Sequence, residues 1–186
     1  MVLLDKTRAA IWIKVGAALL AIIFVMSFMP LFRGGVAADF FKSMFQSNRQ
    51  PSEQLELAKL KKDVEKNPKD AKALVDLANY YYDHQDAKNA ITYYTKALEI
   101  DPNNVDVRVD MGASYFALQN YDKALEAFRT ATEMKPTHPQ AWYNMGLVFK
   151  QKNDVPNQKF AWERFLVVQP TGEQADSVRQ ELAKLK

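Results

Sequence analysis

The sequence of 186 residues has no cysteine and only two histidines. Without cysteine it can supply no disulfide bond, thiolate metal site, cysteine nucleophile or lipid-modified cysteine. Neither His84 nor His138 stands at a metal-ligand spacing from a second histidine or a carboxylate. His84 falls in a polar turn, where a lone histidine is usually a surface residue. We therefore expect no metal site, and surface positions for both histidines.

The motifs that catalysis requires are also missing. The six glycines form no phosphate-binding loop, and Gly34 and Gly35 are better explained as a flexible joint. No nucleophile motif is present, and the carboxylates are scattered as on solvent-facing helices. We expect no catalytic residue, no cofactor and no enzymatic activity.

The positive charge is confined to one end of the chain. Residues 1–50 hold six basic and two acidic residues, whereas residues 51–186 hold 19 basic and 20 acidic ones. A nucleic-acid-binding domain carries its basic surface on the folded part. The sequence therefore predicts no nucleic-acid partner.

The longest apolar run, residues 11–32, is interrupted only by Lys14 and Ser27. Its length is close to the roughly 20 residues that a helix needs to cross a bilayer. Trp12 and the long side chain of Lys14 suit the membrane interface at one end of the run. The pattern predicts a cytoplasmic tip and a transmembrane anchor in residues 1–33.

A cleaved signal peptide is the alternative, because Val36 and Ala38 would suit a peptidase. We favour an uncleaved anchor, since the run exceeds the roughly 7–15 residues of a signal core and Arg33 follows it. The basic residues near the two ends favour a single-pass bacterial cell-membrane protein with a cytoplasmic N-terminus. The remaining chain would then lie on the outer, periplasmic side.

Residues 34–52 contain a second apolar group before a short polar linker. Phe40, Phe41, Met44 and Phe45 fall on one face of a helix. That face suits the lipid interface, so membrane lipid is one expected partner. Packing of the same side chains against a protein partner or the folded domain is the equal alternative.

A pattern repeats every 34 residues through the rest of the chain. Its columns are Leu77, Met111, Met145; Ala78, Gly112, Gly146; Tyr81, Tyr115, Phe149; Tyr94, Phe128, Trp162; and the prolines Pro68, Pro102, Pro136, Pro170. Small and aromatic residues at helical spacing favour closely packed helices that end before each proline. The pattern predicts three helical hairpins, in residues 71–104, 105–138 and 139–172. Gln158 replaces a small residue, so we expect looser helix contact in the third hairpin.

The repeat resembles the tetratricopeptide-repeat family. The middle unit matches the family pattern at Gly112, Tyr115, Ala124, Phe128, Ala131 and Pro136, whereas the third departs from it at Gln158 and Phe165. The resemblance extends over about 102 residues. It implies an all-α, right-handed solenoid of three hairpins, here of a membrane-anchored bacterial type.

Both ends of such a solenoid need capping helices. Apolar residues at helical spacing predict a leading helix in residues 53–70 and a terminal one in residues 173–186. The spacing of Thr137 to Gln140, and of Thr171 to Gln174, predicts a capping box at each of two helix starts.

The resemblance implies a concave groove, lined by the first helix of each hairpin, for a peptide or a partner helix. The candidate residues are Asp76, Asn79, Tyr82, Asp106, Val109, Asp110, Phe116, Tyr143, Asn144 and Leu147. Family members that bind the C-terminal carboxylate of chaperones use basic and amide residues, at positions held here by Val75, Asn79, Asp110, Gln140 and Asn144. Since Asp110 would repel a carboxylate, we expect no such clamp. A partly basic segment with apolar anchors fits better.

We interpret the chain as a membrane-tethered scaffold or adaptor that assembles or recruits envelope or membrane proteins. An accessory structural subunit of a larger membrane complex is the alternative.

Overall fold

The computed structural model describes residues 51–185 of the chain. The predicted membrane span and the interface candidates Trp12, Lys14, Phe40, Phe41, Met44 and Phe45 lie outside the described residues. Within residues 51–185 no helix combines the length and the apolar character needed to cross a bilayer.

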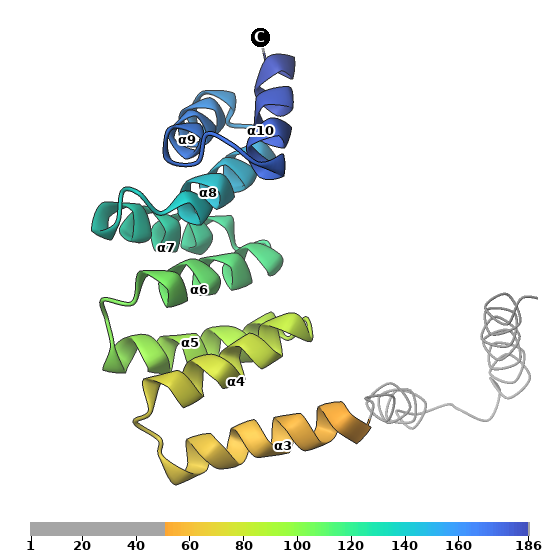
Figure 1. Cartoon of the computed structure of the whole chain (residues 1–186), viewed down its shortest axis with the longest axis vertical. Helices are drawn as coiled ribbons and strands as arrows, with labels where there is room; N and C mark the ends of the chain where they lie inside the picture. The colour runs from red at the N-terminus through yellow and green to blue at the C-terminus, as the bar shows by residue number, and fades with distance from the viewer. Residues whose placement is uncertain (1–50, 186) are drawn as a thin grey trace, which may run out of the picture. The chain divides into compact units, whose positions relative to one another are not determined.

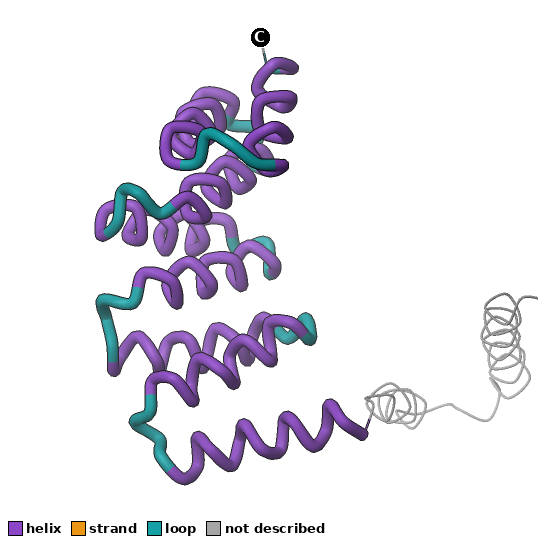
Figure 2. The backbone as a smooth tube through the Cα atoms, viewed as in Figure 1, coloured by secondary structure: helices purple, strands orange, loops and turns teal. Residues whose placement is uncertain are grey.

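The described residues form helices joined by short turns, and they include no strand (Figures 1 and 2). The helices are α3 (Pro51–Lys66), α4 (Ala71–Asp83), α5 (Ala87–Ile100), α6 (Val105–Ala117), α7 (Tyr121–Met134), α8 (Pro139–Gln151), α9 (Val155–Val168) and α10 (Glu173–Lys184). They stack in sequence order, from α3 at the lower end of the view in Figure 1 to α10 at the upper end.

Three helix pairs, α4 with α5, α6 with α7 and α8 with α9, form the tightest contacts, and each pair packs on the next. Each pair lies within one 34-residue unit of the sequence pattern. The all-α solenoid of helical hairpins is therefore confirmed for the described residues. In addition α6 touches α8 directly, so first helices of successive hairpins are neighbours.

The hairpins are held closed by a small residue opposite a large aromatic one. A Cβ atom added to Gly112 would lie 2.6 Å from Phe128 Cε1, and one added to Gly146 would lie 2.1 Å from Trp162 Cδ1. Both rings are fully buried. The absence of a side chain on the first helix thus creates the space for the ring on the second.

Gln158 is buried with an exposed fraction of 3 %. The third hairpin closes around it as a helix pair like the other two.

Short polar side chains start most of the helices. A side-chain oxygen of the N-cap residue accepts a backbone hydrogen bond at α4, α5, α6, α7 and α9, from Asp70, Asp86, Asn104, Asn120 and Asp154 respectively. This satisfies one of the amide groups that the first helical turn leaves without a partner.

The predicted capping boxes are wrong, because the N-caps are the next residues along the chain. His138 begins α8, where the Ala141 amide donates to His138 Nδ1 at 3.3 Å. Gly172 begins α10 with a φ of 106° and no side-chain hydrogen bond. Pro139 explains the shift at α8, since proline favours the first helical position and so places the cap at residue 138.

The surface position expected for His138 is wrong as well, since only 9 % of it is exposed. Its Nε2 atom lies 2.9 Å from Asp106 Oδ1 on α6. His84 is half-buried, and its ring stacks on Tyr80 with centroids 3.9 Å apart. Both histidines are therefore structural contacts of the solenoid.

Candidate functional site

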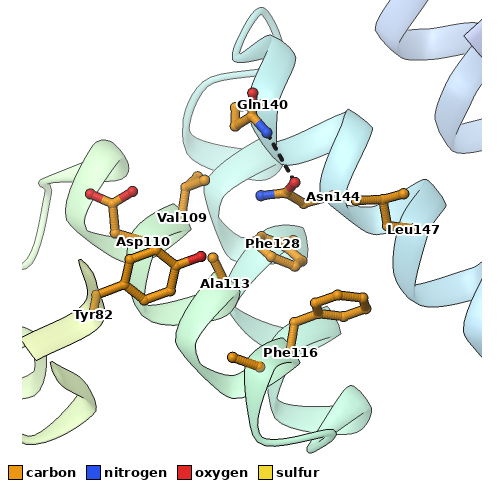
Figure 3. A pocket seen from close by; sticks show the side chains of 10 residues that line it. Tyr82, Val109, Asp110, Ala113, Phe116, Phe128, Gln140, Asn144 and Leu147 are labelled. Atoms are coloured by element: carbon orange, nitrogen blue, oxygen red, sulfur yellow. Dashed lines mark hydrogen bonds between the residues drawn. The ribbon is translucent and has the colours of Figure 1, made fainter. Parts of the chain in front are cut away.

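A pocket of about 420 Å³ opens between the first helices of the three hairpins (Figure 3). Its lining comes from α4, α6 and α8, together with one side chain of α7. The lining residues are Tyr82, Val109, Asp110, Ala113, Phe116, Ala117, Phe128, Gln140, Asn144 and Leu147. We call this space the groove pocket.

The floor of the groove pocket is apolar. Val109, Ala113 and Phe116 follow one another at helical spacing on α6, so their side chains share one face of that helix. Phe128 of α7 closes the floor from below, and Leu147 of α8 forms the facing wall. Such a surface favours an apolar side chain of a partner over water.

Polar groups stand along one wall. Gln140 Nε2 donates to Asn144 Oδ1 at 3.0 Å, and both residues lie on one face of α8 because they are four positions apart. This hydrogen bond occupies the Asn144 oxygen and leaves its amide nitrogen turned toward the pocket in Figure 3. That nitrogen can donate to a backbone carbonyl of a bound segment.

The opposite wall is acidic. Partial burial among protein atoms raises the pKa of the Asp110 carboxyl, and the negative charges of Asp106 and Asp83 raise it further, whereas His138 lowers it. Burial also raises the pKa of the Tyr82 hydroxyl, with Asp110 and Asp83 adding to the shift. In both cases the cause is a partly desolvated region of negative potential.

A second pocket of about 410 Å³ adjoins the first along α4 and α6, and Asp110 lines both. Its walls include Lys72, Val75 and Asp106. The two pockets therefore form neighbouring parts of one acidic surface between the first and second hairpins.

Six of the predicted groove residues line the groove pocket: Tyr82, Val109, Asp110, Phe116, Asn144 and Leu147. Asp106 lines the second pocket. Asp76 accepts from Lys72 Nζ at 2.5 Å, beside a separate hollow between α3 and α4.

Two predicted residues serve the hairpins themselves. The Tyr94 hydroxyl donates to Asn79 Oδ1 at 2.6 Å, which ties α5 to α4. The Tyr143 ring packs on Phe165 with centroids 5.5 Å apart, and the Tyr143 carbonyl accepts from Trp162 Nε1 at 3.2 Å. Neither residue lines the groove pocket.

The prediction missed Phe128 and His138. Phe128 reaches the pocket floor from a second helix because Gly112 leaves a gap in α6. The 34-residue pairing of these two positions was the available signal. Since His138 immediately precedes Pro139, its position at the first turn of a helix was the corresponding signal for an N-cap.

Among the described residues no group of histidines and acids has the geometry to hold a metal ion.

Comparisons with known proteins bear on the fold. Residues 81–147 match a model of the tetratricopeptide repeat. A search of curated proteins gave no match. Together with the solved structures below, the match supports the tetratricopeptide-repeat assignment.

Three solved structures illustrate the likeness. The crystal structure of MamA has a TM-score of 0.61 at 19% identity, over 69% of this chain and 81% of that one. The first tetratricopeptide-repeat domain of Spaghetti (RPAP3), bound to the HSP90 peptide SRMEEVD, has a TM-score of 0.57 at 23% identity, over 62% and 89%. PilF of Pseudomonas aeruginosa has a TM-score of 0.63 at 26% identity, over 72% and 60%.

Proposed function

We propose that this chain is a membrane-tethered helical-repeat scaffold that binds an extended or helical segment of a partner protein in the groove pocket. The observation that carries the proposal is the pocket itself, to which three successive hairpins contribute side chains. A surface assembled from several repeats suits a ligand that runs across them. The chain acts by binding and performs no catalysis.

Peptide binding by a similar fold supports this proposal. The RPAP3 domain, whose fold matches this chain, was solved with the HSP90 peptide SRMEEVD. The groove here has different chemistry, because Asp110 stands in its wall. A peptide that ends in acidic residues and a free carboxylate would be repelled. The proposed partner is therefore not a chaperone C-terminus.

The tether rests on the sequence of residues 11–32, whose length and composition suit a bilayer span. We propose a cytoplasmic N-terminus and repeats on the outer face of a bacterial cell membrane. Confinement to the membrane surface raises the effective concentration of the scaffold near other membrane proteins. A role in assembling or recruiting envelope proteins follows from this placement.

Photo-crosslinking in native membranes tests the proposal. A benzophenone amino acid replaces Gln140, which lies at the rim of the groove pocket, and in a second variant replaces Glu133, which lies on α7 outside the pocket lining. We expect a defined protein adduct from position 140 and none from position 133, identified by mass spectrometry. Equal adducts from both positions, or none from either, would count against the groove.

Protease access tests the orientation separately. In right-side-out vesicles the proposed topology exposes the repeats, so added protease should digest them without detergent. Protection of the repeats until the vesicles are opened would reverse the topology and leave the groove proposal standing.

A further inference from the structure

We infer that the groove pocket selects a partner segment in which a lysine or arginine accompanies an apolar side chain. The apolar side chain would occupy the floor around Phe116 and Leu147, and the cation would lie against Asp110. The inference rests on the proposed function and specifies which segment the groove accepts.

The apolar floor and the acidic wall belong to the same cavity. Val109 and Asp110 are consecutive on α6, and both line the pocket (Figure 3). The Tyr82 ring lies beside Asp110 and is 39% exposed. A cation that reaches the carboxylate therefore also meets an accessible aromatic ring, which attracts it further.

The carboxylates of this wall have no cation of their own. Within residues 51–185 neither Asp110 nor Asp83 forms an ion pair or a side-chain hydrogen bond. The nearby Lys72 bonds to Asp76 at 2.5 Å, and Lys150 is paired with Glu181. The lysines of α4 and α8 are therefore engaged elsewhere.

His138 does not supply the missing charge. Its Nδ1 atom accepts a hydrogen bond from the Ala141 amide, so that nitrogen carries no proton. Its Nε2 atom is then the protonated one and donates to Asp106. A ring with one proton is neutral, and the wall keeps its full negative charge.

Asp83 strengthens the same field from α4. It is the last residue of that helix, where the helix dipole already places partial negative charge. A carboxylate at this end is unfavourable for the isolated helix. A bound cation would relieve the repulsion among Asp83, Asp106 and Asp110, and this complementarity identifies a basic segment as the occupant.

A peptide array tests the inference with the full chain purified in mild detergent. The probes are immobilised 12-residue peptides that place one Phe or Leu at one to four positions from one Lys. Matched peptides carry Glu or Gln in place of that Lys. Peptides bound on the array are then labelled with fluorescein, and their Kd is measured by fluorescence polarisation.

We expect the Lys peptides to bind and the Glu peptides to fail. Asp110→Asn should weaken the Lys peptides about 3- to 10-fold, as for other partly exposed charge pairs, while it leaves the Gln peptides unchanged. Glu133→Gln is the matched control, since it removes one negative charge outside the pocket. Phe116→Ala should weaken Lys and Gln peptides alike, and circular dichroism checks that each variant is folded.

Two results would overturn the inference in different ways. If Lys and Gln peptides bind equally, and Phe116→Ala weakens both, the groove binds segments but does not select a cation. If no peptide binds, or neither Asp110→Asn nor Phe116→Ala changes binding, the proposed groove function fails together with the inference.

Discussion

At the scale of single residues, three positions adopt the same unfavourable backbone conformation. Gln85, Gln119 and Asn153 have φ values of 61°, 58° and 56°, and each lies in the turn between the two helices of a hairpin. They are 34 residues apart, so the strain recurs with the repeat. Asparagine tolerates this left-handed region better than glutamine, and glycine tolerates it best.

Gln119→Gly should therefore stabilise the chain. The gain is about 0.5–1 kcal/mol, because relief of the left-handed strain exceeds the extra entropy that glycine loses on folding. Urea denaturation followed by circular dichroism measures it. Glutamine 119 is exposed and Gln119→Ala serves as the control, since alanine keeps the strain. Equal stability of the glycine and alanine variants would contradict the explanation.

Gly146 illustrates the opposite case, in which space rather than conformation demands glycine. An added Cβ would lie 2.1 Å from both Cδ1 and Nε1 of Trp162, which is fully buried. Gly146→Ala should lower the free energy of unfolding by about 1–3 kcal/mol through overpacking. The double variant Gly146→Ala with Trp162→Phe, measured by the same denaturation, should recover part of that loss, because the smaller ring leaves room for the methyl group.

At the scale of helices, His138 joins two of them through one ring. It caps α8 through Nδ1 and holds Asp106 of α6 through Nε2. Because α8 carries Gln140, Asn144 and Leu147, this contact fixes one wall of the groove pocket relative to the α6 floor.

His138→Ala should lower the free energy of unfolding by about 1–2 kcal/mol, since it removes a helix cap and an inter-repeat hydrogen bond. His138→Asn restores a cap acceptor and should recover roughly half of the loss. Asp106→Asn gives the inter-repeat part alone. Thermal denaturation of the three variants separates the two contributions. Equal losses in His138→Ala and His138→Asn would show that the cap contributes nothing.

The helices and their pairing were predictable, whereas contacts between repeats were not. The column of Gly112 with Phe128 encodes closeness within one hairpin, and a repeat of 34 residues makes it visible. The groove floor and Asp110 followed from the same register. The hydrogen bond from His138 to Asp106 joins residues 32 positions apart and has no counterpart in the other repeats. A pairing that occurs once leaves no periodic signal in a single sequence.

At the scale of the whole described solenoid, stability passes between neighbours. Each hairpin contacts only the next, and α10 contacts α9. The terminal helix covers Trp162 and Phe165 with Ala175, Val178 and Leu182. It is also tied to α8 by the ion pair of Lys150 with Glu181. A solenoid without its cap exposes the apolar face of its last repeat.

Removal of residues 173–186 should therefore destabilise the chain locally. Exposure of the apolar surface that Val178 and Leu182 cover costs about 3–5 kcal/mol, and the loss falls on α8 and α9. Hydrogen exchange should show faster exchange in these two helices, while the amides of α4 and α5 keep their protection because α10 does not touch them. Leu182→Ala in the full chain should show the same order with a smaller effect. Equal loss of protection in all three hairpins would mean that the repeats unfold as one unit, and the nearest-neighbour description of this solenoid would fail.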